Sequence, residues 1–294
     1  MTDITAPPAT GVVVAQPGYS AELPPWRLLL RRPTFLVGAA ILLFWVVCAI
    51  FGNAIAPHDP LAQQLLATNQ PPSAAHWFGT DQLGRDVFSR IVAGVRYILL
   101  VSLLATVLGT VLGTAIGLVM GYLGGVADIV VGRLIEAVLA FPLVVLAFLF
   151  IVALGTSPPV IIFVVGFVFT PIIARTVRSA VLVESQLDYL SSARLLGEKP
   201  AYIMFTEITP NVLPTVLVEF TVRLGYAIFT IAALSFLGFG VQPPTPDWGA
   251  DIAVNYVTLG AGYWWQTLFA ALAIASLVIA INLVTDSIEQ VIAS

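Results

Sequence analysis

The only two histidines of the chain lie near acidic residues in one polar segment, and these side chains together could bind a metal ion. Imidazole nitrogens and carboxylate oxygens are common protein ligands of Zn²⁺. The spacing of the four residues is not distinctive of such sites, so we expect ordinary polar loop residues and assign no metal site. The four candidates are His58, Asp59, His76 and Asp81.

The motifs of phosphate-binding and hydrolytic enzymes are missing from the sequence. Lys199 is the only lysine and lies in Gly-Glu-Lys-Pro, so the chain has no Gly-x-x-x-x-Gly-Lys-Ser/Thr phosphate loop. No Gly-x-Ser-x-Gly elbow occurs, and a Ser-His-Asp hydrolase would need a histidine near its nucleophile. We therefore expect no catalytic residue, no cofactor-binding residue and no enzymatic activity.

The composition indicates the class of protein to which these polar residues belong. The 294 residues are 59% hydrophobic and only 10% charged, whereas a soluble domain carries about 25% charged residues. Twelve basic residues against sixteen acidic ones give no basic surface, so we expect no nucleic acid partner. The single cysteine excludes an internal disulfide. The class of protein that fits this composition is an all-α integral membrane protein.

Long uncharged runs predict six transmembrane helices. A membrane-spanning helix needs about 20 apolar residues. The uncharged run 137–174 would be about 57 Å long as one helix, and the turn signal at 155–159 divides it into two spans. The predicted spans are 34–56, one within 97–127, 134–154, 160–181, 212–237 and 264–287.

The distribution of basic residues predicts that both termini are cytoplasmic. With six spans, eight basic residues fall inside and three fall outside. The first 26 residues have no apolar core of their own, so we expect residues 1–30 to form a flexible cytoplasmic tail and not a cleaved signal peptide.

The three outer arginines, Arg85, Arg90 and Arg96, lie beside apolar residues at helical spacing, which predicts an interfacial amphipathic helix over 86–97. This helix would lead into the second span. The two long outer segments, 58–96 and 239–263, could form either a docking surface or a rigid connector.

Two patterns inside the spans predict helix contacts or a transport path. Glu219 and Arg223 are four residues apart, so on a helix they share a face and can form an ion pair. They could line a translocation path or its gate, or they could hold a neighbouring subunit. Glycines at every fourth position of the second span predict a helix-packing face. These glycines are Gly109, Gly113, Gly117 and Gly121.

The polar segment between the fourth and fifth predicted spans predicts a helix–glycine–helix elbow parallel to the membrane. Residues 188–196 favour a helix, Gly197 can adopt the positive φ that ends it, and Pro200 can begin the next helix. Small side chains at 191–193 would let another protein approach, and Tyr202 would supply apolar contact.

This elbow resembles the coupling motif of ABC-transporter permease subunits, in which Glu-Ala-Ala is followed by a glycine and then by Ile-x-Pro. Ala193, Gly197, Ile208 and Pro210 match the motif, whereas Ser191 and Ser192 replace its Glu and its first Ala. Three further segments, 78–90, 174–178 and 235–249, resemble the dipeptide, oligopeptide and nickel importer permeases, specifically their shorter C-type subunit.

The resemblance implies the permease of a binding-protein-dependent importer, most simply one for di- or oligopeptides. It implies a sister permease, two cytoplasmic ATPase subunits that hold ATP and Mg²⁺, and an extracytoplasmic solute-binding protein. It also implies a plasma (inner) membrane location. The coupling residues would be Ser191, Ser192, Ala193, Gly197, Tyr202, Ile208 and Pro210.

Under this interpretation the chain divides into three parts: the tail 1–30, the first span with its outer segment at 31–96, and a five-span permease core at 97–294. Two alternatives stay open. An ion-coupled secondary transporter would need a cluster of polar groups at the membrane midplane. A nickel-chelate importer belongs to the same family.

Overall fold

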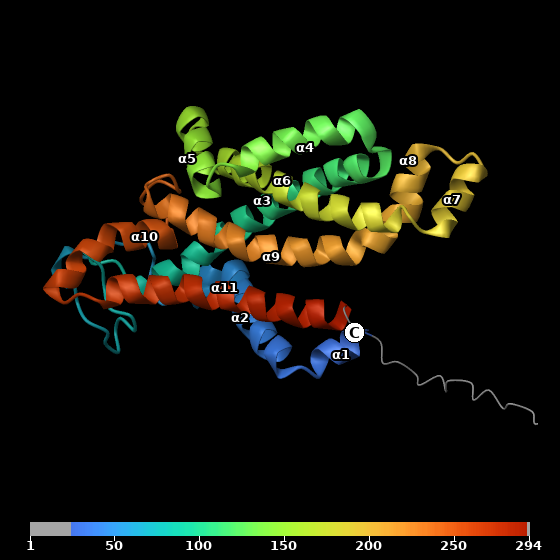
Figure 1. Cartoon of the computed structure of the whole chain (residues 1–294). Coiled ribbons are helices and arrows are strands. Elements are labelled where there is room, and N and C mark those ends of the chain that lie inside the picture. The colour runs from blue at the N-terminus through green and yellow to red at the C-terminus, as the bar shows by residue number, and fades with distance from the viewer. Residues whose placement is uncertain (1–24, 293–294) are drawn as a thin grey trace, which may run out of the picture.

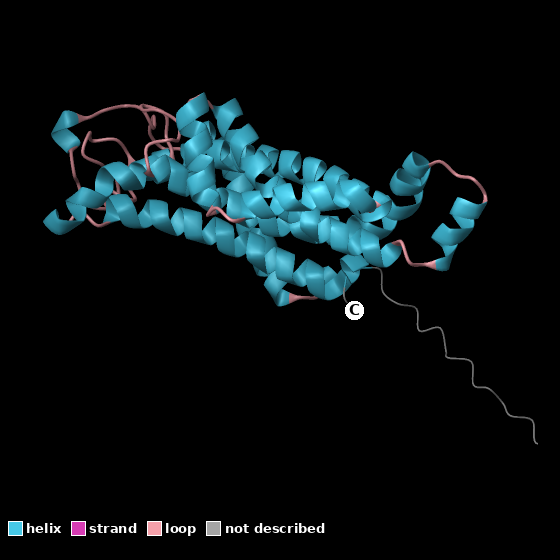
Figure 2. Ribbon diagram, turned by 45° about the horizontal axis from the view of Figure 1, so that its top comes forward, coloured by secondary structure: helices cyan, strands magenta, loops and turns pink. Residues whose placement is uncertain are grey.

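The computed structural model describes residues 25–292, and every regular element in this range is helical. The long helices lie side by side along one direction, with most loops at one end of the bundle (Figure 1). Two short helices, α7 and α8, project from the opposite end, as Figure 2 also shows. Residues 1–24, most of the predicted tail, lie outside the described residues.

The chain builds this bundle from eleven α-helices and three shorter helical turns within the described range. The helices are α1 (Pro25–Leu30), α2 (Pro33–Ile55), α3 (Val87–Leu123), α4 (Gly125–Leu139), α5 (Leu143–Leu154), α6 (Pro158–Glu184), α7 (Asp188–Leu195), α8 (Pro200–Tyr202), α9 (Thr209–Phe236), α10 (Trp248–Asn255) and α11 (Trp265–Ile292). The turns are η1 (Leu65–Ala67), η2 (Ile203–Ile208, a π-helix) and η3 (Tyr256–Ala261).

Five of these helical segments are long and apolar enough to cross a membrane, and a bent pair of helices supplies a sixth candidate. The bent pair, α4 and α5, turns by 90°, so the third span is not the straight helix predicted over 134–154. Pro142 lies at the break and directly precedes α5. Proline has no N–H group and disfavours helical geometry in the residue before it, which explains why α4 ends there.

The second predicted span is part of one uninterrupted helix, α3, of 37 residues. Asp86 caps its N-terminus by accepting a 2.8 Å hydrogen bond from the Ser89 N–H. The predicted interfacial helix forms the first turns of α3, but Val87, Ile91 and Val95 are buried and do not face a membrane surface. The reason is that α10 and the loops before α3 and α10 fold over these turns.

The glycine face of α3 packs directly on α6, as the four-residue spacing predicts. A Cβ atom added at Gly109 or at Gly117 would lie 2.8 Å from a backbone oxygen of α6. Gly166 of α6 meets Ala105 in the same way, also at 2.8 Å. Glycine is required at these positions because any side chain would force the two backbones apart.

We predict that Gly117→Ala lowers the thermal unfolding midpoint of the full-length chain in detergent by several degrees. The new Cβ would lie 2.8 Å from both the Ala174 oxygen and the Val177 Cβ, and overpacking of this kind costs about 1–3 kcal/mol. Gly132→Ala is the matched control, because its Cβ would meet only the Met120 Cε at 3.8 Å. An equal change in both variants would contradict the close-packing interpretation.

Candidate functional site

The two long outer segments pack together around the N-terminus of α3. Arg90 of α3 and Asp251 of α10 form a buried ion pair, with 2.6 Å between Nη2 and Oδ1. The indole N–H of Trp248, also on α10, donates a 2.8 Å hydrogen bond to the Ile91 carbonyl oxygen. Trp248 is 1% exposed, so this contact fixes α10 tightly on α3.

Arg90 joins more than one segment at this end of the bundle. Its Nη1 donates to the carbonyl oxygens of Pro60 and Pro244, at 3.2 and 3.3 Å. Burial raises the pKa of the Asp251 carboxyl, and the Arg90 guanidinium opposes that rise. The sequence predicted that Arg90 lies in a helix at the membrane–water interface, and it did not identify Asp251 as a partner. The two residues are 161 positions apart, and no local pattern indicates such a pair.

A second set of contacts ties the first outer segment to α11. The indole N–H of Trp265 donates to the Thr80 carbonyl oxygen at 3.1 Å, and the side-chain amide of Gln266 donates to the same oxygen at 3.0 Å. Beside them, Asp81 and Arg85 form a buried ion pair at 2.6 Å. These contacts make the outer segments one structured cap, which we define as residues 58–90 together with 239–266.

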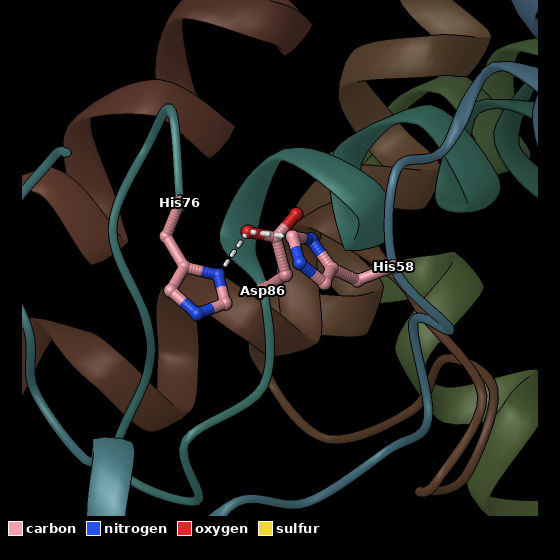
Figure 3. Close-up of side chains that lie close together, drawn as sticks. All are labelled: His58, His76 and Asp86. Atoms are coloured by element: carbon pink, nitrogen blue, oxygen red, sulfur yellow. Dashed lines mark hydrogen bonds and ion pairs between the residues drawn. The ribbon is translucent and has the colours of Figure 1, made fainter. Parts of the chain in front are cut away.

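The cap also brings the two histidines together, although not with the carboxylates considered from the sequence. His58 and His76 both lie against Asp86 (Figure 3). The Nδ1 of His76 is 2.8 Å from the Asp86 Oδ1, and the Nδ1 of His58 is 3.7 Å from it. Asp81 instead pairs with Arg85, and Asp59 is exposed at the surface.

Glu219 and Arg223 form the ion pair that their spacing predicts. The Arg223 Nε lies 2.9 Å from the Glu219 Oε2. Thr176 of α6 donates a 2.7 Å hydrogen bond to the other carboxylate oxygen, Oε1. Glu219 is buried at 8% exposure. The pair therefore contributes to the contact between α6 and α9, in addition to linking two residues of α9.

The segment between α6 and α9 contains two short helices joined at Gly197. Gly197 has φ +79°, a left-handed conformation that suits glycine. Leu195 and Leu196, just before it, are 89% and 82% exposed. The guanidinium of Arg194 lies 5.1 Å from the centre of the Tyr122 ring at the end of α3, so this segment contacts the longest helix of the bundle.

The residues matched to the coupling motif differ in their exposure. Ile208 is fully buried, which makes it a packing residue of η2. Ala193 is partly buried. The remaining motif residues lie at the surface: Ser191, Ser192, Gly197, Tyr202 and Pro210.

We predict that Arg90→Ala destabilises the cap strongly, because it leaves the Asp251 carboxylate buried without its cation. Removing one partner of a buried ion pair costs about 3–5 kcal/mol. Thermal unfolding of the detergent-purified chain measures the loss. Arg96→Ala is the control, since Arg96 is exposed on the same helix. The double variant Arg90→Ala/Asp251→Asn should recover part of the stability, and no recovery would contradict the pairing.

Two known protein families match separate parts of this chain. Residues 113–294 match the family described as the inner membrane component of binding-protein-dependent transport systems. Residues 25–72 match the N-terminal transmembrane domain of oligopeptide transport permease C.

Several permeases are similar to this chain over nearly its whole length. The dipeptide transport system permease of Bacillus subtilis is 34% identical over 94% of this chain and 87% of its own length. The probable D,D-dipeptide permease of Escherichia coli K12 is 34% identical over 90% of this chain and 89% of its own length. A glutathione permease of Pectobacterium atrosepticum is 35% identical over 90% of this chain and 88% of its own length. The chain therefore belongs to the binding-protein-dependent ABC importer permeases, as a C-type subunit of the peptide group.

Proposed function

We propose that this chain forms half of the translocation pore of an ATP-driven importer for di- or oligopeptides. The observation that carries the proposal is the similarity over at least 90% of the chain to permeases named for dipeptides and for glutathione, which is itself a small peptide. The chain would work in the inner membrane with both termini in the cytoplasm. A nickel-chelate substrate is the alternative within the same family.

The proposed partners divide the work by location. A sister permease completes the pore, and two cytoplasmic ATPase subunits bind ATP and Mg²⁺ and hydrolyse the nucleotide. A solute-binding protein delivers the peptide to the cap on the outer face. We expect this chain itself to bind neither ATP nor its Mg²⁺ and to catalyse no reaction.

The segment 188–202 is the proposed coupling element. It projects from the bundle opposite the cap, as Figure 1 shows for α7 and α8. Leu195 and Leu196 at its tip expose apolar surface that a partner could bury. Movement imposed on this segment would reach α6 and α9, because it connects them directly, and would reach α3 through the Arg194–Tyr122 contact. Movement of the ATPase subunits, passed on through this segment, would open and close the pore.

A secondary transporter is the competing function, and the bonding of Glu219 argues against it. An ion-coupled site needs polar ligands that are free to bind the coupling ion at mid-membrane. Both carboxylate oxygens of Glu219 are already bonded to Arg223 or Thr176. This arrangement fits a fixed helix contact or a gate better than an open cation site.

We predict that Leu195→Asp/Leu196→Asp abolishes ATP-dependent peptide uptake and the co-purification of the ATPase subunits, while the chain remains folded in the membrane. Both side chains lie at the surface of the chain, so folding does not require them. The measurements are affinity purification in mild detergent with mass spectrometry, and uptake of labelled dipeptide into vesicles loaded with ATP.

Leu66→Asp is the control for that experiment, because Leu66 is fully exposed in the cap at the other end of the bundle. It should leave ATPase association intact. Uptake that continues without ATP and collapses with an ionophore would overturn the importer proposal in favour of the secondary transporter. Normal association of the Leu195/Leu196 variant would overturn only the coupling element.

We further propose that the Glu219–Arg223 pair gates the pore, and predict that Glu219→Gln changes the uptake rate at least about tenfold, equivalent to about 1.4 kcal/mol. Loss of the charge weakens the ion pair while keeping the hydrogen bond from Thr176 possible. Uptake and co-purification of the sister permease are measured together. Thr221→Ala, on the same helix, should change neither. Loss of the sister permease with Glu219→Gln would contradict a gate and indicate a subunit contact.

A further inference from the structure

Two imidazole rings and one carboxylate from three different parts of the cap meet at one point. His58 lies just beyond α2, His76 lies in the turn that precedes α3, and Asp86 caps the N-terminus of α3. The ligand atoms of these three residues all lie within 4.8 Å of one another. Figure 3 shows the two rings on either side of the Asp86 carboxylate.

We propose that His58, His76 and Asp86 bind a divalent transition-metal ion, of which Zn²⁺ is the representative. Two imidazole nitrogens and one carboxylate oxygen are ligands that zinc accepts readily, with a water molecule in the fourth position. The proposal does not depend on the transported substrate. It concerns a resident ion in the cap.

The distances suit an ion of this size. Zinc–ligand bonds of about 2.0–2.2 Å at tetrahedral angles place neighbouring ligand atoms about 3.3–3.6 Å apart. The two Nδ1-to-Oδ1 distances, 2.8 Å for His76 and 3.7 Å for His58, lie on either side of this value. The ligand atoms of the two histidines lie within 4.8 Å of each other, so shifts of about 1 Å would bring all three atoms to the spacing of a tetrahedral site.

The charge balance around Asp86 also favours a bound cation. The Asp86 side chain is 1% exposed, and a buried carboxylate needs a compensating charge. The arginines on either side are engaged elsewhere, Arg85 with Asp81 and Arg90 with Asp251. Within the described part of the chain, only the two histidines form ion-pair contacts with Asp86. A bound divalent cation would neutralise the carboxylate.

An unsatisfied nitrogen points to the same conclusion. The Nδ1 of His58 is buried and has no hydrogen-bond partner. A buried polar atom without a partner costs about 1–3 kcal/mol. Its nearest acidic atom is 3.7 Å away, too far for a good hydrogen bond. Coordination to a metal ion would satisfy this atom without any change in the fold.

The residues around the cluster hold the carboxylate in place. The Asp86 Oδ2 accepts hydrogen bonds from the N–H and the hydroxyl of Ser89, at 2.8 and 2.7 Å. The Ser89 hydroxyl oxygen also accepts from the His58 N–H at 3.2 Å. With Oδ2 occupied, Oδ1 remains directed at the histidines. Hydrogen bonds of this kind orient the ligands in metal sites and raise their affinity.

A metal ion here would act as a structural clamp on the cap. It would join the end of α2, the turn before α3 and the N-terminus of α3, which otherwise meet through hydrogen bonds. Since His58 is about one-third exposed, the ion can enter from solvent, and water can occupy its open position.

The test uses the full-length chain purified with a histidine-free tag and stripped with a chelator. Isothermal titration with ZnCl₂ should give one equivalent bound with a Kd of roughly 1 µM or tighter, about −8.2 kcal/mol. Zinc should also raise the thermal unfolding midpoint, because the ligand set exists only in the folded chain. Titration with Co²⁺ should give the visible absorption of a tetrahedral nitrogen–oxygen site.

His58→Gln should weaken zinc binding by at least about tenfold and remove the cobalt spectrum. This variant is chosen because His58 is the most exposed ligand, so the cap should still fold, which the unfolding midpoint without metal verifies. Asp59→Asn, its exposed neighbour, is the matched control and should bind zinc normally. Absence of zinc binding to the wild-type chain, binding unchanged in His58→Gln, or equal loss in Asp59→Asn would each overturn the proposal.

Discussion

The contact between α3 and α6 is the constraint on which the rest of the molecule depends. Helices in a membrane gain little from hydrophobic burial against each other, so their association relies on close packing. The glycines of α3 allow its backbone to approach that of α6, with backbone oxygens only 2.8–3.0 Å from the positions where Cβ atoms would lie. Because α3 has 37 residues, this contact also sets the relative position of the two ends of the bundle.

The two ends of α3 carry different kinds of interaction. At its N-terminus, buried carboxylates and arginines form specific pairs that hold the surrounding loops together as the cap. At its C-terminus, Tyr122 meets Arg194 of a projecting segment with exposed leucines. Desolvated pairs specify one geometry, whereas exposed apolar side chains remain available to a partner. The proposed import mechanism, in which a solute arrives on one side and a mechanical input on the other, would make use of this asymmetry.

The buried charges of the bundle interior are satisfied within the chain. Glu219 is bonded to Arg223 on its own helix and to Thr176 on α6. A pair of this kind reduces the cost of placing charge in the membrane, and it also couples α9 to α6. Any relative rotation of these two helices would have to break or rearrange the bonds. A gate and a helix contact are therefore related roles for the same atoms.

The sequence alone was sufficient for features whose cause is local. Composition identified a membrane protein, helical periodicity paired Glu219 with Arg223, and the four-residue glycine spacing located the face that meets α6. The motif order indicated the family.

Tertiary structure alone decided the contacts between distant segments. The Arg90–Asp251 pair spans 161 residues, and His58 and His76 meet Asp86 instead of the acidic residues nearest to them in the sequence. Pro142 marks a helix break in the sequence, but the 90° angle between α4 and α5 is evident only in the tertiary structure. Periodicity specifies which residues share a helix face, but it cannot specify which distant segment packs against that face.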